Sequence, residues 1–450
     1  MSNSVPDICP SSGKPKPPSV HDLDIYHENG KGYLVRSGND YIVMSASDLK
    51  RHLLRLGFSG RRRFPQSEVE EALNEVQMHK SVAYSGPLAG YKAGVWEMAG
   101  KKILVTGGPK IVEPDPSVEW PTIRALIEQM LCPDEGRQLR YFYGWLSHAY
   151  RCLRKGEIAP GQALALAGPR QCGKTLAQQI IREVLGGREA SPYAFMTGTS
   201  DFNRELFGAE NLIFGDEVAA TDYRARMKFG AMLKQLVVNP TQRCHGKGRE
   251  AIALAPFWRL TMSLNDESAN LEVLPPLSHD SIVDKIILLQ AVRPPILGQD
   301  DWCSRSRSEN WARIQGELPG FCAFLDQYQI PAELRDGRFG ITHYQNPDLL
   351  VQLKAETPER RLLELIDQVE LYWDPAAPSS RDGWECTAAM LEQRLENSDS
   401  AKMTARKLLH YQTACGQYLA QLAVCHPDRV RKEKHRNGLQ QYRILPPSKS

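Results

Sequence analysis

The chain has 450 residues, a formal net charge of +3 and ten cysteines. This length predicts two to four domains, and the near-neutral charge excludes a chain that binds nucleic acid through its overall charge. No two cysteines form a C-x2-C pair, so the sequence indicates neither a zinc ribbon nor a disulfide framework and favours a reducing, cytoplasmic location. No apolar run has the length of a signal peptide or a membrane span, so we expect no membrane association.

The amino-terminal quarter predicts a tail followed by a small mixed domain. Residues 1–19 are rich in Pro, Ser and Lys, a composition typical of a disordered tail. An α+β domain is then expected over residues 20–116. Its expected elements are strands from Ile25, helices over residues 46–56 and 66–80, and strands over 81–111. Two amphipathic helices, over residues 121–130 and 136–154, form a lead-in over residues 117–160 to the next domain.

The clearest functional motif begins at Gly168. Residues 164–167 are apolar enough for a buried strand, and the next eight residues match G-x4-G-K-[ST] at every fixed position. In such a loop the glycines supply unusual dihedral angles, and backbone N–H groups converge on phosphate beside a positive helix N-terminus. The predicted nucleotide-binding residues are Gly168, Pro169, Arg170, Gln171, Cys172, Gly173, Lys174 and Thr175.

A pair of carboxylates supports this prediction. Lys174 is expected to reach the β- and γ-phosphates of ATP, and Thr175 the magnesium ion. A chance match is the alternative, and an acidic pair on a later strand argues against it. The apolar run 211–214 leads to Asp216 and Glu217. We expect Asp216 to hold Mg²⁺ through water and Glu217 to polarise the attacking water; without a phosphate loop, the pair would be read as a solvated strand end.

Two further features follow an expected helix over residues 222–236. The basic, glycine-rich run 243–250 predicts the tip of a hairpin, with an ordinary surface turn as the alternative. Residues 257–265 predict a strand that ends in Asn265. The side-chain amide of Asn265 is therefore in a position to sense the γ-phosphate and orient water.

These motifs, in this order, resemble those of the superfamily 3 helicases. The similarity is in particular to the helicase modules of phage and plasmid primase-helicases. It rests on GPRQCGKT, FGDE, the basic hairpin and TMSLN. The resemblance covers residues 121–295 and is weaker in both flanks. It implies an AAA+-like P-loop ATPase over residues 117–297, which uses ATP and Mg²⁺ and forms a homo-hexameric ring on DNA. By this likeness Lys174, Glu217 and Asn265 are catalytic.

The resemblance also implies DNA contacts and a cation that acts on a neighbouring subunit. His245 and Lys247 are expected to project into the ring channel and grip a single DNA strand. Such ATPases usually place an arginine beyond the sensor strand, yet residues 266–282 contain neither Arg nor Lys. Lys285, the first cation beyond the sensor strand, is predicted to be the trans-acting catalytic group, and Arg293, the next cation, is the alternative. A lysine in this role lacks the bidentate fork of a guanidinium.

The carboxyl-terminal third predicts a helical linker region and a DNA-binding domain. Helices are expected around Trp311 and over residues 358–371 within the linker region 298–380. Further helices over 387–395 and 401–424, then a basic hairpin with an Asn-Gly turn, predict a winged-helix-like domain over residues 381–450. A basic tail on a helical bundle is the alternative. The predicted duplex contacts are Arg431, Lys432, Lys434 and Arg436.

The sequence thus predicts an α/β protein with an AAA+-like P-loop core between a strand-rich N-terminal domain and a winged-helix-like C-terminal domain. The predicted function is an ATP-dependent, ring-forming DNA helicase or translocase in the replication of a phage, plasmid or integrated element. Replication proteins are possible further partners. Two alternatives are an ATPase that loads or remodels replication proteins without unwinding, and a DNA-binding regulator in which nucleotide controls only assembly.

Overall fold

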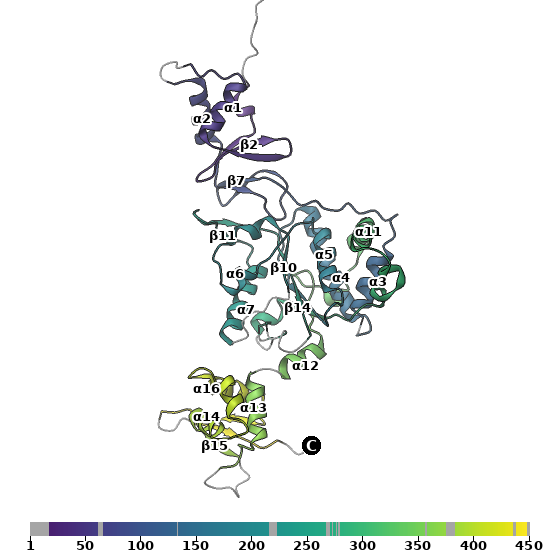
Figure 1. Ribbon diagram of the computed structural model, residues 1–450, viewed down its shortest axis with the longest axis vertical. Coiled ribbons are helices and arrows are strands. Elements are labelled where there is room, and N and C mark those ends of the chain that lie inside the picture. The colour runs from purple at the N-terminus through teal and green to yellow at the C-terminus, as the bar shows by residue number, and fades with distance from the viewer. Residues whose placement is uncertain are drawn as a thin grey trace, which may run out of the picture.

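The computed structural model describes residues 18–61, 66–132, 134–215, 223–266, 271, 273–275, 277, 280–355, 358–374, 383–434 and 438–447. The predicted tail, except for Pro18 and Ser19, lies outside these residues, as do Asp216, Glu217 and Arg436. Figure 1 shows three parts stacked in chain order: an N-terminal unit, a central body and a C-terminal unit. None of the helices among these residues is both long and apolar enough to span a bilayer.

The N-terminal unit, residues 20–82, is a four-stranded sheet covered by two helices. The sheet has the order β3-β2-β1-β4. Both helices begin at a serine whose side chain accepts a backbone N–H, and Ser67 forms a capping box with Glu70. Leu49 and Leu53 pack with Val76 in a core separate from that of the central body. The elements are η1 (Val20–Asp22), β1 (Ile25–Glu28), β2 (Gly32–Ser37), β3 (Asp40–Met44), α1 (Ala46–Arg55), α2 (Glu68–His79) and β4 (Ser81–Val82).

A small sheet of order β5-β7-β6 connects this unit to the central body. Its strands are β5 (Tyr84–Gly86), β6 (Gly94–Met98) and β7 (Lys101–Val105). Ile103 and Val105 belong to the same hydrophobic core as one face of the central sheet. The small sheet therefore packs as part of the central body, although the chain reaches it directly from the N-terminal unit. The predicted domain boundaries themselves remain predictions.

The central body is built on a five-stranded parallel sheet of order β14-β8-β13-β10-β9. β8 and β13 are buried along their whole length, as parallel strands covered on both faces are. The strands are β8 (Ala163–Ala167), β9 (Glu189–Ala190), β10 (Asn211–Phe214), β13 (Arg259–Leu264) and β14 (Ile286–Gln290). The expected α/β class is confirmed.

Helices cover the two faces of this sheet. Leu164 and Leu166 face the core that holds α3, α4, α5 and α11, whereas Ala163, Ala165 and Ala167 face the core that holds α7. The N–H groups that α3 leaves free at its start are partly satisfied by α11, because Ile123 N donates to the buried Glu317 carboxylate across 2.9 Å. The helices are α3 (Pro121–Met130), α4 (Arg137–Lys155), α5 (Lys174–Val184), α6 (Tyr193–Thr197), α7 (Tyr223–Val238), α9 (Asp280–Val283), α10 (Asp300–Cys303), α11 (Arg307–Gln327) and α12 (Pro347–Ala355), with short 3-10 turns η2 (Arg204–Gly208), η3 (Pro295–Gly298) and η4 (Ala332–Leu334).

The C-terminal unit, residues 358–447, has its own core around Trp384 and a three-stranded sheet of order β15-β17-β16. Both strand pairs of this sheet are antiparallel. The elements are α13 (Pro358–Gln368), β15 (Trp384–Cys386), α14 (Ala388–Glu396), α15 (Lys402–Leu408), α16 (Ala414–Cys425), β16 (Val430–Lys432) and β17 (Tyr442–Ile444).

The prediction of a single helix over residues 401–424 was wrong. The chain forms two helices, α15 and α16, which both pack on α14. The residues between them include His410, Tyr411 and Thr413, which have low helix propensity. Leu409 on one side and Ala414 on the other are buried in the same core. Burying both ends of this connection requires a turn, and the stabilisation from packing exceeds that of continuing the helix.

Candidate nucleotide site and nucleic-acid surfaces

The predicted phosphate loop joins β8 to α5 at the carboxyl edge of the central sheet. Gly173 (φ 95°) and Gln171 (φ 61°) both adopt left-handed backbone conformations. Residues in this conformation turn successive N–H groups toward one side of the chain, which creates a concavity suited to an anion. Gly168 has no space for a side chain, since a Cβ atom there would lie 2.0 Å from the carbonyl oxygen of Ala291. The first glycine of the motif is therefore required by close backbone packing against the chain beyond β14.

Lys174 is the first residue of α5, and its side chain turns back into this loop. The residue is 5% exposed. Its ammonium donates to the carbonyl oxygens of Gly168 at 2.7 Å and Pro169 at 2.9 Å. It also lies 3.3 Å from Oδ1 of Asn265. The cation is thus held inside the loop by oxygen atoms, in a position where the phosphate oxygens of a nucleotide could replace them.

Asn265 directly follows β13, and the sheet order explains its contact with Lys174. β13 lies between β8 and β10, with Leu264 paired to Ala167 and Met262 paired to Phe214. Because these strands are parallel, their carboxyl ends meet at the same edge, where ligands of open α/β sheets bind. Gly215 is the last described residue after β10, so the predicted roles of Asp216 and Glu217 lie outside the described residues.

The remaining loop residues differ in exposure. The side chains of Pro169, Arg170, Gln171 and Thr175 are exposed, whereas Cys172 is buried. Burial raises the pKa of the Cys172 thiol, which keeps it uncharged beside Lys174. Among the described residues, no group of three or more His, Cys, Asp or Glu side chains is placed to hold a metal ion. The exposed Thr175 hydroxyl, the glycine turns and Lys174 together fit a nucleotide phosphate chain with Mg²⁺.

Sequence reasoning missed a chain of buried polar side chains behind the loop. Gln178, one turn after Lys174, donates to the hydroxyl of Thr261 at 3.4 Å. Thr261 in turn donates to Oδ1 of Asn211 at 3.2 Å. These bonds connect α5 through β13 to β10, and they fix the helix that carries Lys174 against the strand that leads to Asp216. The three residues are far apart in sequence, so no local pattern predicts the chain of bonds.

The two candidates for the trans-acting cation lie beyond opposite ends of the strand β14. Lys285 precedes β14, is 6% exposed and pairs with Asp284. Its carbonyl oxygen accepts from Ala163 N, at the start of β8. The five residues of β8 separate it from the phosphate loop, a distance of roughly 16 Å. Arg293 lies just beyond the other end of β14, at the same edge as the loop, and is exposed.

The expected basic hairpin forms, from β11 (Gln242–Cys244) and β12 (Ile252–Leu254). Asn203 holds its tip through three hydrogen bonds: its N–H donates to His245 O, its Nδ2 donates to Arg243 O, and its Oδ1 accepts from His245 N. Lys247 is exposed and His245 is half-buried. The His245 ring lies 5.0 Å from that of Phe202, which is 44% exposed. Phe202 thus adds an exposed aromatic ring to this surface.

The second predicted DNA surface lies on β16 and the chain beyond it. Arg431, Lys432 and Lys434 are exposed, whereas Arg436 lies outside the described residues. Arg431 is opposite Arg443 in the sheet, and Arg443 is paired with Glu385 and Glu433. These two ion pairs neutralise Arg443 on the central strand. The other three cations lie exposed on the edge strand β16 and the chain beyond it.

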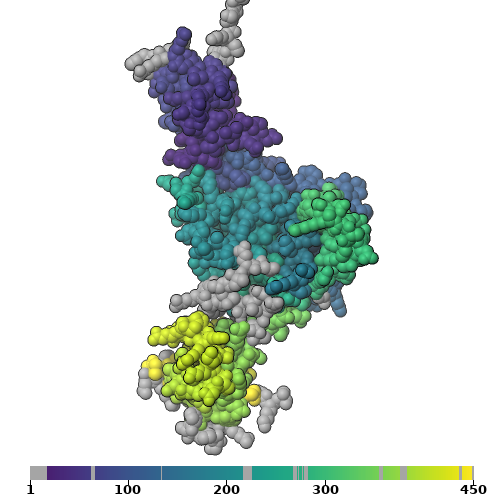
Figure 2. Space-filling view, in the orientation of Figure 1, coloured from purple at the N-terminus to yellow at the C-terminus, as the bar shows by residue number. Residues whose placement is uncertain are grey.

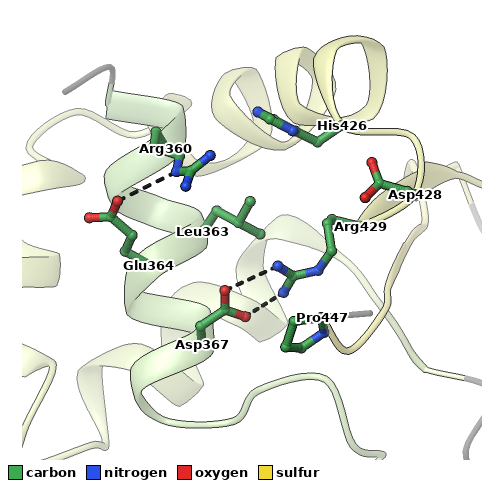
Figure 3. Close-up of a pocket in the computed structure, with 8 residues that line it drawn as sticks. All are labelled: Arg360, Leu363, Glu364, Asp367, His426, Asp428, Arg429 and Pro447. Carbon is green, nitrogen blue, oxygen red and sulfur yellow. Dashed lines mark hydrogen bonds and ion pairs between the residues drawn. The ribbon is translucent and has the colours of Figure 1, made fainter. Parts of the chain in front are cut away.

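Figure 3 shows how the C-terminal hairpin, formed by β16 and β17, is anchored at its base. A pocket of about 270 Å³ lies between α13, the end of α16 and the start of β16. Arg429 donates to both oxygens of Asp367 on α13, and its Nε donates to Leu445 O at 3.1 Å. Two arginines and one histidine line the pocket together with three carboxylates, so the pocket has no dominant charge. We therefore interpret it as a structural support of the hairpin. The residues that line the pocket are Arg360, Leu363, Glu364, Asp367, His426, Asp428, Arg429 and Pro447.

Solved structures of one other protein share the fold of nearly the whole chain. An apo structure of the NrS-1 C-terminal region aligns over 95% of this chain and 97% of that one, with a TM-score of 0.54 and 13% identity. A second apo structure of that region gives the same coverage, with a TM-score of 0.52 and 14% identity. At this identity the similarity shows a shared fold alone. That fold includes the N-terminal and C-terminal units as well as the central body.

The other comparisons cover less of the chain or are weaker. A model of a family of unknown function, DUF5906, matches residues 166–279, which include the phosphate loop, the hairpin and Asn265. The SCCmec type IV Cch active helicase aligns over 88% of this chain and 70% of that one, with 10% identity and a TM-score of 0.28, which is too low to inform on the fold. None of the curated proteins matches the chain.

Proposed function

We propose that the protein is an ATP- and Mg²⁺-dependent, ring-forming DNA helicase or translocase that acts in the replication of a phage, plasmid or integrated element. The observation that carries the proposal is the contact between Lys174 and Asn265 at the carboxyl edge of the central sheet. It brings together the two expected phosphate-sensing groups from separate strands. The strand that leads to Asp216 and Glu217 lies beside them.

In the proposed mechanism each group at this edge has a separate role. Lys174 moves from the loop carbonyls to the β- and γ-phosphates when nucleotide binds, exchanging neutral acceptors for charged ones. Mg²⁺, when bound, neutralises the developing phosphate charge, and Thr175 and Asp216 would hold it. Glu217 polarises the attacking water, and Asn265 orients that water against the γ-phosphate. The backbone N–H groups of residues 170–173 surround the phosphates.

Arg293 is the better candidate for the cation that completes a neighbouring subunit's site. A group that acts on another subunit must extend from the surface, and Lys285 is buried with its ammonium held by Asp284. Arg293 is exposed at the loop edge. It also supplies the planar guanidinium that stabilises transferred phosphoryl groups best. The proposal therefore assigns the trans-acting role to Arg293 in a homo-hexamer.

DNA is proposed to bind at two surfaces. The hairpin tip, with His245 and Lys247, grips a single strand in the ring channel, and Phe202 offers a ring on which a base can stack. The exposed cations of the C-terminal hairpin contact the phosphates of duplex DNA in a winged-helix manner. The order of helices and strands in the C-terminal unit supports this proposal.

Strand displacement on a forked DNA duplex tests the proposal. We expect ATP hydrolysis that single-stranded DNA stimulates, and displacement of the labelled strand that requires ATP and Mg²⁺. Hydrolysis without displacement, at any fork polarity, would instead favour an ATPase that loads or remodels proteins. DNA binding with negligible turnover would favour a nucleotide-controlled regulator.

A further inference from the structure

Glu28 is a buried carboxylate in the N-terminal unit that the proposed mechanism does not use. It ends β1, is 3% exposed, and is surrounded by cations from two parts of the molecule. Its Oε1 lies 2.5 Å from Arg249 in the hairpin tip and 3.1 Å from Arg204. Its Oε2 accepts from the Ser85 hydroxyl and lies 3.8 Å from Lys31. One carboxylate of the N-terminal unit thus binds the hairpin of the central body.

Arg204 connects this charge cluster to the rest of the hairpin support. It follows Asn203, whose backbone and side chain hold the hairpin at His245 and Arg243. The Arg204 side chain also passes beneath the turn, since a Cβ atom at Gly246 would lie 3.0 Å from its Cδ. The tip is therefore held on one side by Asn203 and on the other by the Glu28 cluster.

The charge balance makes Glu28 indispensable to the cluster. Lys31, Arg204 and Arg249 are each about three-quarters buried and share this one carboxylate. Burial lowers the pKa of Lys31, while Glu28 raises it and the two arginines lower it further. Removing one partner from a buried charge network leaves the remaining charges uncompensated. Without the negative charge of Glu28, the three cations repel one another and the ion pair between the tip and β1 is lost.

We propose that Glu28 is a positioning residue that fixes the DNA-gripping hairpin against the N-terminal unit, so that this unit takes part in coupling DNA to hydrolysis. The inference rests on the proposed function for the role of the hairpin, but the tether itself does not. Figure 2 shows the N-terminal unit, in purple, lying directly against the teal part of the central body. Glu28 acts on the hairpin through Arg249, with which it forms an ion pair.

The first test measures the tether without any activity. In Glu28→Gln, backbone hydrogen exchange of peptides that cover residues 242–254 should become faster by about fivefold or more, because the tip opens locally. Exchange in the C-terminal unit should not change. Glu71→Gln, an exposed carboxylate on α2 of the same unit, is the matched control and should exchange as wild type. Unchanged exchange in the hairpin of folded Glu28→Gln protein would overturn the proposal.

The second test measures coupling. Glu28→Gln should raise the concentration of single-stranded DNA that gives half-maximal stimulation by about fivefold, since only correctly placed hairpins contribute to affinity. Hydrolysis without DNA should stay at the wild-type level. Arg249→Ala should behave like Glu28→Gln. Arg249→Lys should keep the wild-type value, because a single nitrogen of Arg249 makes the contact with Glu28. The double variant Glu28→Gln/Arg249→Ala should be no worse than either single variant.

The outcomes separate the inference from the proposed function. Wild-type protein that hydrolyses no ATP would reject the function, while the exchange experiment would still decide on the tether. Active wild-type protein with Glu28→Gln indistinguishable from it would reject the inference alone. Tighter DNA binding by Glu28→Gln would also overturn it, because Glu28 would then compete with DNA phosphates for the arginines.

Discussion

Lys174 and Asn265 lie 91 residues apart in the chain, yet the lysine ammonium and the asparagine amide oxygen are 3.3 Å apart. The contact exists because β13 lies directly beside β8 in a parallel sheet, so the residues that follow both strands meet at one edge. In the proposed mechanism this pair senses the presence and the state of the γ-phosphate.

Lys174 and Glu217 should separate nucleotide binding from turnover. Lys174→Ala should lose ATP binding, because its ammonium contacts phosphate charge in the ground state. Glu217→Gln should bind ATP normally and lose turnover, because a general base acts on water chiefly in the transition state. Fluorescent nucleotide titration and steady-state hydrolysis measure the two effects. Wild-type turnover in Glu217→Gln would remove Glu217 from the proposed role.

Asn265→Ala should mainly reduce kcat. The amide orients water rather than supplying charge, so we expect kcat to fall by about 10- to 100-fold, or roughly 1.4–2.7 kcal/mol in barrier, with ATP affinity within about threefold of wild type. Asn239→Ala, an exposed asparagine after α7, is the control. An unchanged kcat in Asn265→Ala would leave Asn265 with only a structural contact to Lys174.

The C-terminal hairpin should contribute salt-dependent duplex binding. Replacing Arg431, Lys432 and Lys434 with alanine should weaken binding and lower the slope of log K against log salt by about one unit for each phosphate that is no longer neutralised. Hydrolysis without DNA should not change. A matched triple variant on α1, in which alanine replaces Lys50, Arg51 and Arg55, is the control. The same slope in both variants would indicate that the C-terminal cations form only a solvated surface.

Sequence alone predicts the parts of the site that depend on local order. The phosphate loop requires glycine at Gly168, where a side chain has no space, and at Gly173, where the backbone is left-handed. A short sequence motif records both requirements. The hairpin is similarly local, since a glycine-rich turn connects the two short paired strands β11 and β12. The roles of Asp216 and Glu217 stay predictions, because these residues lie outside the described part of the chain.

What sequence does not predict depends on tertiary register. Lys285 is one candidate cation in the sequence, but the position of β14 beside β8 places it at the edge opposite the phosphate loop. The contact of Glu28 with Arg249 joins residues 221 positions apart and needs the docking of two units. The break between α15 and α16 is set by burial of Leu409 and Ala414, whereas local apolar spacing alone suggests one helix.

The most direct measurement of the central claim is strand displacement by a protein with the double substitution His245→Ala and Lys247→Ala. If the hairpin tip transmits hydrolysis to DNA, stimulation by single-stranded DNA and displacement of a forked duplex should both collapse. Hydrolysis without DNA should stay within about threefold of wild type, well under 1 kcal/mol in barrier, because neither residue belongs to the phosphate loop. Full unwinding by the double variant would contradict the account, since the hairpin would then not grip DNA.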